Sequence, residues 1–469
     1  MQSALMAAPE ARDAIQQQLR FKEANLPPAS GRIDHAPVQR TLIGTFAAAR
    51  TQVQEYRCRS SGDKTTAFGW NCAKWMTTAM SMSSLKIRSG EVFLVSLPIR
   101  RPHHWVGHTA RLGEGYAVLR LELENGIVGW GEAQVISTWG GDHGARYGEA
   151  PKMTATAIKE ILLPAIAGAN VTEVEQVHAR MNRALRGYPY AKAAIDVALH
   201  DAIGKIYGVP VYQLLGGKVR DGTALAHSIG IMDADAAARE AAEVIAEGIT
   251  TIKVKIGVEA ERDIKVVAAV RQAIGSAGKI RVDANQGYRT WREAVRVIAA
   301  MEKYDLVYVE QPVEGLRAMA EVSARINLPV MADESAWTAE DVLEIVRLNA
   351  AQMLSVYYTK PGGLAPTKRL LAVAGAASLP CDINGSAEMG IGVAADLHLA
   401  VSSPEIVLPG TIPVTSTAEM VVTKVAGHKY LDDLIKTPFR FEKGFLYVPD
   451  GPGLGIEVDE AKIAKYRIG

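Results

Sequence analysis

The sequence predicts an α/β protein built on a (β/α)8 barrel of the TIM type, preceded by an α+β unit. Three observations favour this fold class. Eight short apolar strands follow Leu215, helical stretches fall between most of them, and an acid or a lysine ends five successive strands. Eight strands with helical crossovers are the count of a closed parallel barrel. A doubly wound open sheet is the alternative, but the even repeats and the lack of a glycine-rich phosphate turn disfavour it.

The composition is that of an ordinary soluble globular protein. Of 469 residues, 48% are apolar and 22% are charged, and 52 Lys and Arg nearly balance 51 Asp and Glu. This balance gives no indication of nucleic acid or an anionic membrane as a partner, and no apolar run approaches the length of a membrane span. Three scattered cysteines do not make a disulfide framework or a zinc cluster, and the N-terminus lacks the apolar core of a signal peptide. We therefore expect a cytoplasmic protein.

Residues 1–84 differ from the rest of the chain. The stretch 57–84 has no clear periodicity and is rich in Ser, Thr and Gly. Met80 and Met82 stand just before the first convincing strand. One interpretation is a disordered leader that an upstream start codon adds, and the other is a short helical appendage. The sequence leaves both open.

An α+β unit follows at residues 85–215. Two extended stretches, 85–99 and 116–135, are predicted to be strands, and the second contains a hairpin turn at Glu124-Asn125-Gly126. The predicted helices cover residues 152–168, 171–185 and 191–208, and the last ends at a glycine shortly before a proline. Strands followed by helices are typical of an α+β arrangement.

The barrel is predicted at residues 216–412. Its eight strands are residues 224–231, 250–256, 279–284, 306–311, 328–334, 353–360, 379–384 and 405–410. Helical stretches between them include residues 234–248, 261–275, 290–304 and 338–349. The tail, residues 413–469, returns to strand character and has to pack outside the barrel.

An acid or a lysine ends each of five successive barrel strands. These residues are Lys255, Asp283, Glu310, Asp333 and Lys360. A single Asp at a strand end is most often a turn residue or a helix N-cap. Five such residues in register are different, because the strand ends of a barrel converge on one cavity, where barrel enzymes have their active sites.

The three carboxylates among them indicate a cation. Carboxylates that converge on one point repel one another unless a positive charge neutralises them. No His or Cys joins the set, so a hard divalent ion with oxygen ligands fits best, either Mg²⁺ or Mn²⁺.

Two lysines, Lys253 and Lys255, lie two residues apart in a β-branched strand and so share one face. Burying two ammonium groups together is costly without compensation, so a pair inside the barrel indicates a function. A lysine beside another lysine and a metal has a lowered pKa and can act as a base near neutral pH. With Lys360 almost opposite, the set predicts removal of the proton α to a carboxylate through a metal-stabilised enediolate.

These motifs resemble the enolase superfamily, in its muconate lactonizing enzyme subgroup. The resemblance rests on KVK at 253–255, the Asp of RVDANQG, the Glu of VEQP, the Asp of ADES and the Lys of YYTKPGG. It covers about residues 85–469. It implies a capping α+β domain (85–215) before the barrel (216–412), completed by the C-terminal segment 413–469.

The resemblance also implies roles for single residues. Asp283, Glu310 and Asp333 are implied to be the Mg²⁺ ligands, Lys255 and Lys360 the two acid/base groups, and Lys253 a supporting lysine. Asn285, which shares a strand face with Asp283, and Glu334 are expected to support the site. The mandelate racemase subgroup pairs a seventh-strand His with a sixth-strand Asp. Here the seventh strand has no His, and His398 lies too far along the chain.

Substrate contacts are expected from two stretches of the capping domain, residues 100–108 and 138–148. Both mix aromatic, His and Gly residues, as suits a loop that closes over a small polar ligand. His104 and Trp105 are the candidates in the first stretch. From the barrel we expect Tyr358, which shares a face with Lys360, and Asn384 and Glu388 after the seventh strand.

The predicted enzyme is an isomerase that acts on a small carboxylic acid. The leading prediction is a racemase or epimerase, or a cycloisomerase of the muconate kind. A dehydratase of a β-hydroxy acid such as a hydroxyproline is the alternative. A catalytically silent binding protein is disfavoured, because all six key positions are filled. The resemblance also implies a homo-oligomer.

Overall fold

The computed structural model describes residues 85–106, 108–110, 115–144, 148–385 and 387–468. Residues 1–84, for which we expect a leader or an appendage, lie outside the described residues. So do residue 107 of the first expected specificity loop and residues 145–147 of the second.

Seven parallel strands form the barrel sheet, in the spatial order β13-β12-β11-β10-β9-β8-β7. They are β7 (Ala226–Ile229), β8 (Thr251–Lys255), β9 (Lys279–Asp283), β10 (Leu306–Glu310), β11 (Val330–Ala332), β12 (Met353–Val356) and β13 (Cys381–Ile383). All five residues of β8 are buried, including its two lysines. Burial on both faces is expected for a parallel sheet that helices cover. Because side chains alternate along each strand, half of them point into the barrel.

The eighth predicted strand, residues 405–410, is not a regular strand. Isolated parallel bridges join Ile406 to Cys381 and Gly410 to Leu225, so the segment still closes the gap between β13 and β7. Pro409 lies within it and lacks the N–H that a continuous ladder needs. The barrel fold class is therefore confirmed, with an eighth member that only bridges its neighbours.

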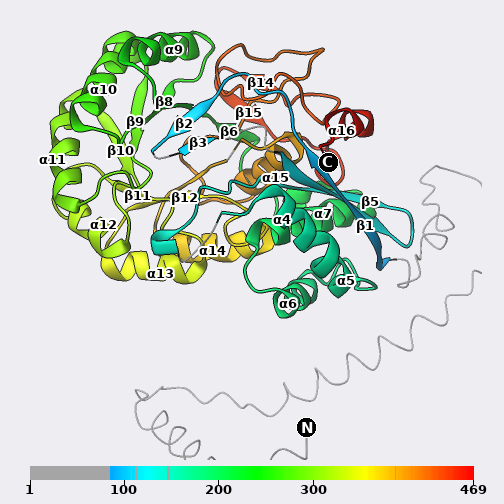
Figure 1. The fold of residues 1–469 in the computed structure, drawn as a ribbon. Helices are drawn as coiled ribbons and strands as arrows, with labels where there is room; N and C mark the ends of the chain where they lie inside the picture. The colour runs from blue at the N-terminus through cyan, green and yellow to red at the C-terminus, as the bar shows by residue number, and fades with distance from the viewer. Residues whose placement is uncertain (1–84, 107, 111–114, 145–147, 386, 469) are drawn as a thin grey trace, which may run out of the picture. The chain divides into compact units, whose positions relative to one another are not determined.

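Helices alternate with the strands and surround them. They are α9 (Ala234–Ala246), α10 (Ala260–Ile274), α11 (Trp291–Met301), α12 (Leu316–Ser323), α13 (Ala339–Leu348), α14 (Leu364–Ala376) and α15 (Gly390–Val401). Figure 1 shows α9 to α13 outside strands β8 to β12. Side-chain oxygens of Asp233 and Thr290 cap α9 and α11, and Thr338 forms a capping box with Asp341 at α13. None of the helices in the described ranges has the length and apolar character needed to span a membrane.

The α+β unit begins with an antiparallel sheet of β1 (Ile87–Val95), β4 (Tyr116–Leu123) and β5 (Val128–Ala133). The predicted hairpin joins β4 to β5 through Gly126, whose φ is +81°. Its helices are α6 (Val174–Ala184), α7 (Pro189–Tyr207), α8 (Val211–Leu214) and a first helix in three parts: α4 (Pro151–Thr156), the π-helical turn η4 (Ala157–Leu162) and α5 (Leu163–Ile166). A short ribbon of β2 (His103–Trp105) and β3 (His108–Ala110) precedes β4.

The C-terminal segment contacts both parts of the structure. Strand β14 (Phe441–Glu442) pairs with β15 (Phe445–Tyr447), which in turn pairs with β6 (Gly222–Ala224), just before the barrel. After helix α16 (Glu460–Tyr466), the backbone N–H of Ile468 donates to Leu94 of β1 at 2.8 Å. Earlier in the segment, Gly427 N–H donates to Nδ1 of His227 in β7 at 2.9 Å. The tail thus holds the α+β unit and the barrel together.

Two glycines of β5 allow α7 to approach the sheet closely. A Cβ at Gly131 would lie 1.9 Å from the carbonyl oxygen of Ala194 in α7. We expect Gly131→Ala to lower the free energy of unfolding by about 3 kcal/mol, because a buried helix must shift to make room. Chemical denaturation measures this loss. Gly168→Ala is the control, since nothing lies within 4 Å of its Cβ and only its φ of +69° carries a cost of about 1 kcal/mol. Equal losses in the two variants would contradict the prediction.

Candidate active site

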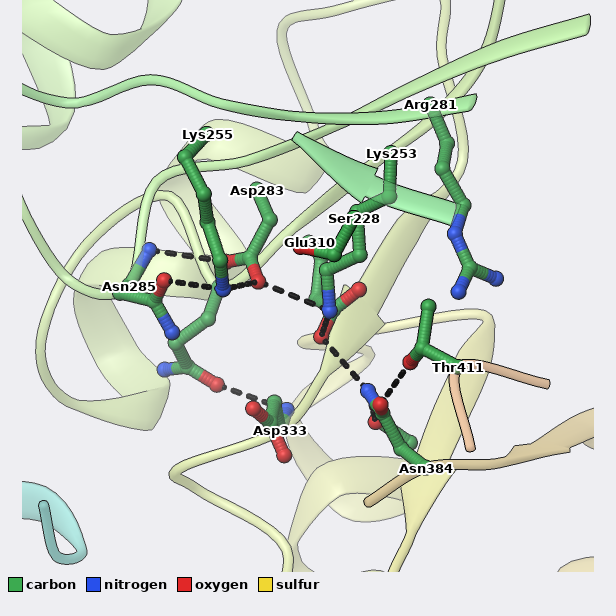
Figure 2. A network of polar contacts seen from close by, with 12 residues as sticks. Ser228, Lys253, Lys255, Arg281, Asp283, Asn285, Glu310, Asp333, Asn384 and Thr411 are labelled. Carbon is green, nitrogen blue, oxygen red and sulfur yellow. Dashed lines mark hydrogen bonds and ion pairs between the residues drawn. The ribbon is translucent and has the colours of Figure 1, made fainter. Parts of the chain in front are cut away.

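Three carboxylates lie at the ends of three neighbouring strands. Asp283 and Glu310 are the last residues of β9 and β10, where they are paired in register, and Asp333 follows β11 directly. All three are buried, with exposed fractions of 0, 0 and 1%. Figure 2 shows them along one edge of the sheet. Three buried acids this close to one another require positive charge beside them.

Lysines supply part of that charge. The Nζ of Lys253 lies 2.9 Å from Oδ2 of Asp283 and 2.7 Å from Oε1 of Glu310, and the Nζ of Lys255 lies 2.6 Å from the same oxygen of Asp283. Figure 2 shows both lysine side chains running toward these carboxylates. Their burial, costly for an isolated ammonium, is therefore compensated by the acids at the strand ends.

The charge of Lys253 is fixed. Burial alone lowers its pKa, but Asp283 and Glu310 outweigh burial and raise the pKa well above the usual lysine value. Lys253 therefore stays an ammonium. Lys253 is thus suited to hold a substrate oxygen rather than to take a proton.

The carboxylates differ in the direction of their pKa shifts and in their hydrogen-bond partners. Burial, together with the charge of Asp283, raises the pKa of Glu310 to about 8. Burial also acts on Asp283, but Lys253 and Lys255 hold its pKa well below the usual range. Oε2 of Glu310 is buried without a hydrogen-bond partner in the described part of the chain. An unpartnered oxygen beside two further carboxylates is a donor set that suits a hard divalent cation.

The metal geometry is nonetheless not preformed. Among the described residues, no three His, Cys, Asp or Glu side chains are grouped closely enough to hold an ion as they stand. The lysines occupy carboxylate oxygens that a cation would use. A cation could enter only as these ion pairs rearrange.

Lys360 lies on the other side of the carboxylates in the strand order. It is in the turn after β12, four residues beyond the strand end, and not in the strand as predicted. Its Nζ lies 2.5 Å from Oδ1 of Asp333 and donates to Ser355 O at 3.0 Å. The same Nζ lies 4.5 Å from the ring centroid of Tyr357 and 5.4 Å from that of Trp139. Because β8 precedes β9 and β12 follows β11, Lys255 and Lys360 flank the three acids.

The predicted supporting residues form a chain of hydrogen bonds. Lys255 donates from Nζ to Oδ1 of Asn285 at 2.6 Å, and Nδ2 of Asn285 donates to Oε1 of Glu334 at 2.8 Å. The indole of Trp139 donates to the same oxygen at 3.1 Å. Burial holds the pKa of Glu334 well above the usual range. Asn285 adopts a positive φ of 41°, which asparagine tolerates better than most residues.

A cavity opens beside these groups. Its lining includes Trp105, Trp139, Lys253, Lys255, Asn285 and Asn384. Asn384 donates from Nδ2 to Ser355 Oγ at 2.8 Å, and Thr411 donates to its Oδ1. Lys360 does not line this cavity, although the two rings that it contacts do. Lys360 lines a neighbouring cavity instead, together with Trp337 and Lys192.

Three predicted substrate contacts lie elsewhere. His104 does not line the cavity, because alternation along β2 turns His103 and Trp105 toward it instead. Tyr358 is fully buried and donates to Oε1 of Gln134 at 3.0 Å. Since β12 ends at Val356, alternation no longer holds there, and Tyr357 lines the cavity in its place.

Glu388 is the third of these. It is fully buried, and its Oε1 accepts from Nε2 of Gln134 at 2.8 Å. It therefore connects the turn before α15 to the residue that follows β5 rather than lining the cavity.

Several lining residues were not predicted. His103 could have been found by applying strand alternation to Trp105. Trp139 lies in the expected loop 138–148 but is not among the predicted substrate contacts. Lys429 also lines the cavity, although it comes from a stretch of the C-terminal segment without helix or strand, and the sequence gives no signal for its position.

Two family models match the chain one after the other. The model described as mandelate racemase / muconate lactonizing enzyme, N-terminal domain, matches residues 89–216. The model described as enolase C-terminal domain-like matches residues 236–462.

Among similar proteins, N-succinyl-L-Arg/Lys racemase of Bacillus cereus is 30% identical, over 82% of this chain and 98% of its own length. Muconate cycloisomerase 1-1 of Acinetobacter lwoffii is 31% identical, over 82% of this chain and 97% of its own length. A solved structure of the Bacillus cereus racemase has a TM-score of 0.75, with 28% identity, and covers 82% of this chain and 98% of its own. A dipeptide epimerase from Enterococcus faecalis, solved with Mg and the dipeptide L-Leu-L-Tyr, has a TM-score of 0.70, with 29% identity, over 79% of this chain and 99% of its own.

Proposed function

This chain belongs to the mandelate racemase and muconate lactonizing enzyme family of the enolase superfamily, as an enzyme of the isomerase class, and from that premise we propose that it inverts the α-carbon of a small carboxylate. The observation that carries the proposal is the position of two lysines on either side of three carboxylates. Lys255 lies beside Asp283 and Lys360 beside Asp333, with Glu310 between them in strand order. Inversion requires a proton to leave one face of a carbon and another to arrive on the opposite face, so two opposed acid/base groups suit it.

The proton transfers balance between these two side chains. One lysine enters as the free amine, takes the α-proton and becomes an ammonium. The electrons of the broken C–H bond delocalise into the substrate carboxylate. The other lysine, already an ammonium, then gives its proton to the opposite face of the same carbon. The next turnover runs in the reverse direction or begins after both lysines exchange protons with solvent.

The neighbouring residues prepare this exchange. Lys253, held as an ammonium by Asp283 and Glu310, can donate to a substrate carboxylate oxygen as charge develops there. Asn285 orients the amine of Lys255 through its hydrogen bond at 2.6 Å. The aromatic rings of Tyr357 and Trp139 stabilise the charged form of Lys360.

Asp283, Glu310 and Asp333 would hold a divalent cation, most suitably Mg²⁺. When bound, the ion supplies stabilisation of the negative charge that develops on the substrate carboxylate. The unpartnered Oε2 of Glu310 supports this assignment, and the Enterococcus faecalis relative was solved with Mg.

A muconate-type cycloisomerase is the second candidate, because a muconate cycloisomerase is among the 31% identical relatives. In that case one lysine would protonate the carbon beside the carboxylate of a ring-closed product, rather than both acting in turn.

We expect the enzyme to incorporate solvent deuterium at the α-carbon of its substrate and to invert that carbon. The test incubates the protein and Mg²⁺ in D2O with N-acylated amino acids, dipeptides, muconates and hydroxyprolines, and follows them by NMR and mass spectrometry. Closure of a muconate to a lactone, with deuterium beside the carboxylate, would favour the cycloisomerase. Loss of water would indicate a dehydratase instead. Absence of exchange with every compound, in protein shown to bind Mg²⁺, would contradict the inversion proposal.

A further inference from the structure

One lysine of the cavity wall has no counter-charge. Lys429 comes from the C-terminal segment and lines the same cavity as Lys253 and Lys255. Those two lysines are paired with strand-end carboxylates at 2.6 to 2.9 Å. Among the described residues, no carboxylate lies within ion-pair distance of the Lys429 ammonium, and no side chain hydrogen-bonds to it. A cation in a cavity wall without a partner is costly, and an anion placed beside it would remove that cost.

The surroundings of Lys429 are also short of negative charge. Burial, together with the positive charges of Arg101 and Lys255, lowers the pKa of Lys429 to about 7, against a weaker opposing effect of Glu388. Arg101 differs, because it is already paired with Glu240. Of the three lysines that line the cavity, Lys429 is therefore the one without a carboxylate partner among the described residues.

Two neutral polar side chains line the same cavity as Lys429. His103 and Ser228 both line it, with Nε2 of His103 3.4 Å from Oγ of Ser228. Burial and the charge of Lys429 hold the pKa of His103 well below its usual value, so the imidazole stays neutral. A cavity wall that carries an ammonium, a hydroxyl and an imidazole offers several hydrogen-bond donors, which suits a carboxylate.

The backbone around Lys429 is fixed in place. Its carbonyl accepts from Arg100 N–H at 2.9 Å, in the stretch that leads to β2. Two residues earlier, Gly427 N–H donates to His227 in β7. The backbone that carries Lys429 is thus held between the α+β unit and the barrel without any ligand, and a group bound there would not have to order the segment first.

We propose that Lys429 is a specificity-determining residue that binds a second anionic group of the substrate, a carboxylate at the end remote from the reacting carbon. The inference rests on the proposed function, which places the reacting carboxylate beside Asp283, Glu310 and Asp333. The substrate class is then a small dicarboxylate with its two acids at opposite ends of the cavity. A substrate with a neutral remote group would leave the half-buried ammonium unpaired, so it would be selected against.

Equilibrium binding tests the subsite without turnover. The probes are adipate and its monoamide, which share one carboxylate and differ only in the second group, and binding is measured by calorimetry with Mg²⁺ present. We expect the wild-type protein to prefer adipate by about 10- to 100-fold, the range for a hydrogen bond to a charged group. Lys429→Met should remove this preference by weakening adipate alone, and Lys429→Arg should restore most of it. Lys424→Met is the matched control, an exposed lysine of the same segment, and should leave the preference unchanged.

Turnover then separates the subsite from the reaction. With N-succinyl amino acids and their terminal amides, Lys429→Met should raise KM for the acid by the same 10- to 100-fold and leave kcat nearly unchanged. Equal weakening of acid and amide would overturn the proposal, because Lys429 would then bind the reacting carboxylate or serve the fold. Absence of any preference for adipate in the wild type would also overturn it. A preference that depends on Lys429, in protein that exchanges no α-proton, would instead contradict the proposed reaction and support the anion subsite.

Discussion

Replacement of Lys360 by methionine is expected to abolish inversion of the substrate while α-proton exchange persists for one of its two stereoisomers. Lys255 remains in this variant and can still remove the proton from the face that it serves. Its amine exchanges with solvent, so deuterium returns to the same face without inversion. Lys255→Met should behave as the mirror image and exchange only the other stereoisomer. Because general acid/base groups contribute about 10²- to 10⁴-fold, inversion should fall by about 10³-fold or more in either variant.

The measurement is deuterium incorporation into each pure stereoisomer, followed by NMR, beside the optical rotation of the mixture. The control is Lys279→Met, an exposed lysine at the start of β9 and away from the carboxyl ends of the strands. Mg²⁺ should still stabilise both active-site variants, which shows that the site has not collapsed. Exchange of both stereoisomers by Lys360→Met would contradict the two-base arrangement. That result would agree with the finding that Lys360 lines a neighbouring cavity rather than the one beside Lys255.

The parts of the site that follow local rules could be predicted from the sequence. Asp283 and Glu310 end β-branched strands, and parallel strands in a barrel bring their ends together. The lysines of β8 share a face by simple alternation, and the structure turns both inward. Predicting these residues required only the two-residue period of a strand and the number of barrel repeats.

Other parts depend on where each strand stops. β12 ends at Val356, so Lys360 reaches Asp333 from a turn, and Tyr357 rather than Tyr358 lines the cavity. The sequence of residues 353–360 gives no sign of this end, because residues 357–360 are buried in the turn just as strand residues are. The eighth barrel position shows the same difficulty: its residues touch both neighbours, but Pro409 prevents a regular ladder.

Contacts between distant segments could not be predicted at all. Lys429 lies 174 positions after Lys255 in the chain and enters the cavity on a stretch without helix or strand. Its place is set by bonds to Arg100 and, through Gly427, to His227. No periodicity encodes such contacts, since each depends on how the C-terminal segment crosses from the barrel to the α+β unit.

Replacement of Glu310 by glutamine is expected to remove most of the stabilisation that Mg²⁺ gives to the folded protein. A cation that binds only the folded state adds RT ln(1 + [L]/Kd), about 2.7 kcal/mol at one hundred times Kd. The variant keeps the size of the side chain but replaces the unpartnered oxygen of Glu310 with an amide group that serves a hard cation poorly. Thermal unfolding with and without Mg²⁺ measures the effect. Glu340→Gln, at an exposed position of α13, is the control and should keep the full stabilisation.

The pH dependence of this stabilisation gives an independent check on the same carboxyl. Burial raises the pKa of Glu310 to about 8 in the cation-free protein, so the folded chain binds this proton more tightly than the unfolded chain does. The contribution of the protonated carboxyl to stability is therefore present below the ordinary glutamate pKa and declines as the pH rises toward 8. Mg²⁺ has to displace that proton, so its stabilising effect should be larger at pH 8 than at pH 6 in the wild type. In Glu310→Gln the remaining effect of Mg²⁺ should change less over this range. An equal stabilisation by Mg²⁺ in wild type and variant, at both pH values, would show that Glu310 is not a ligand.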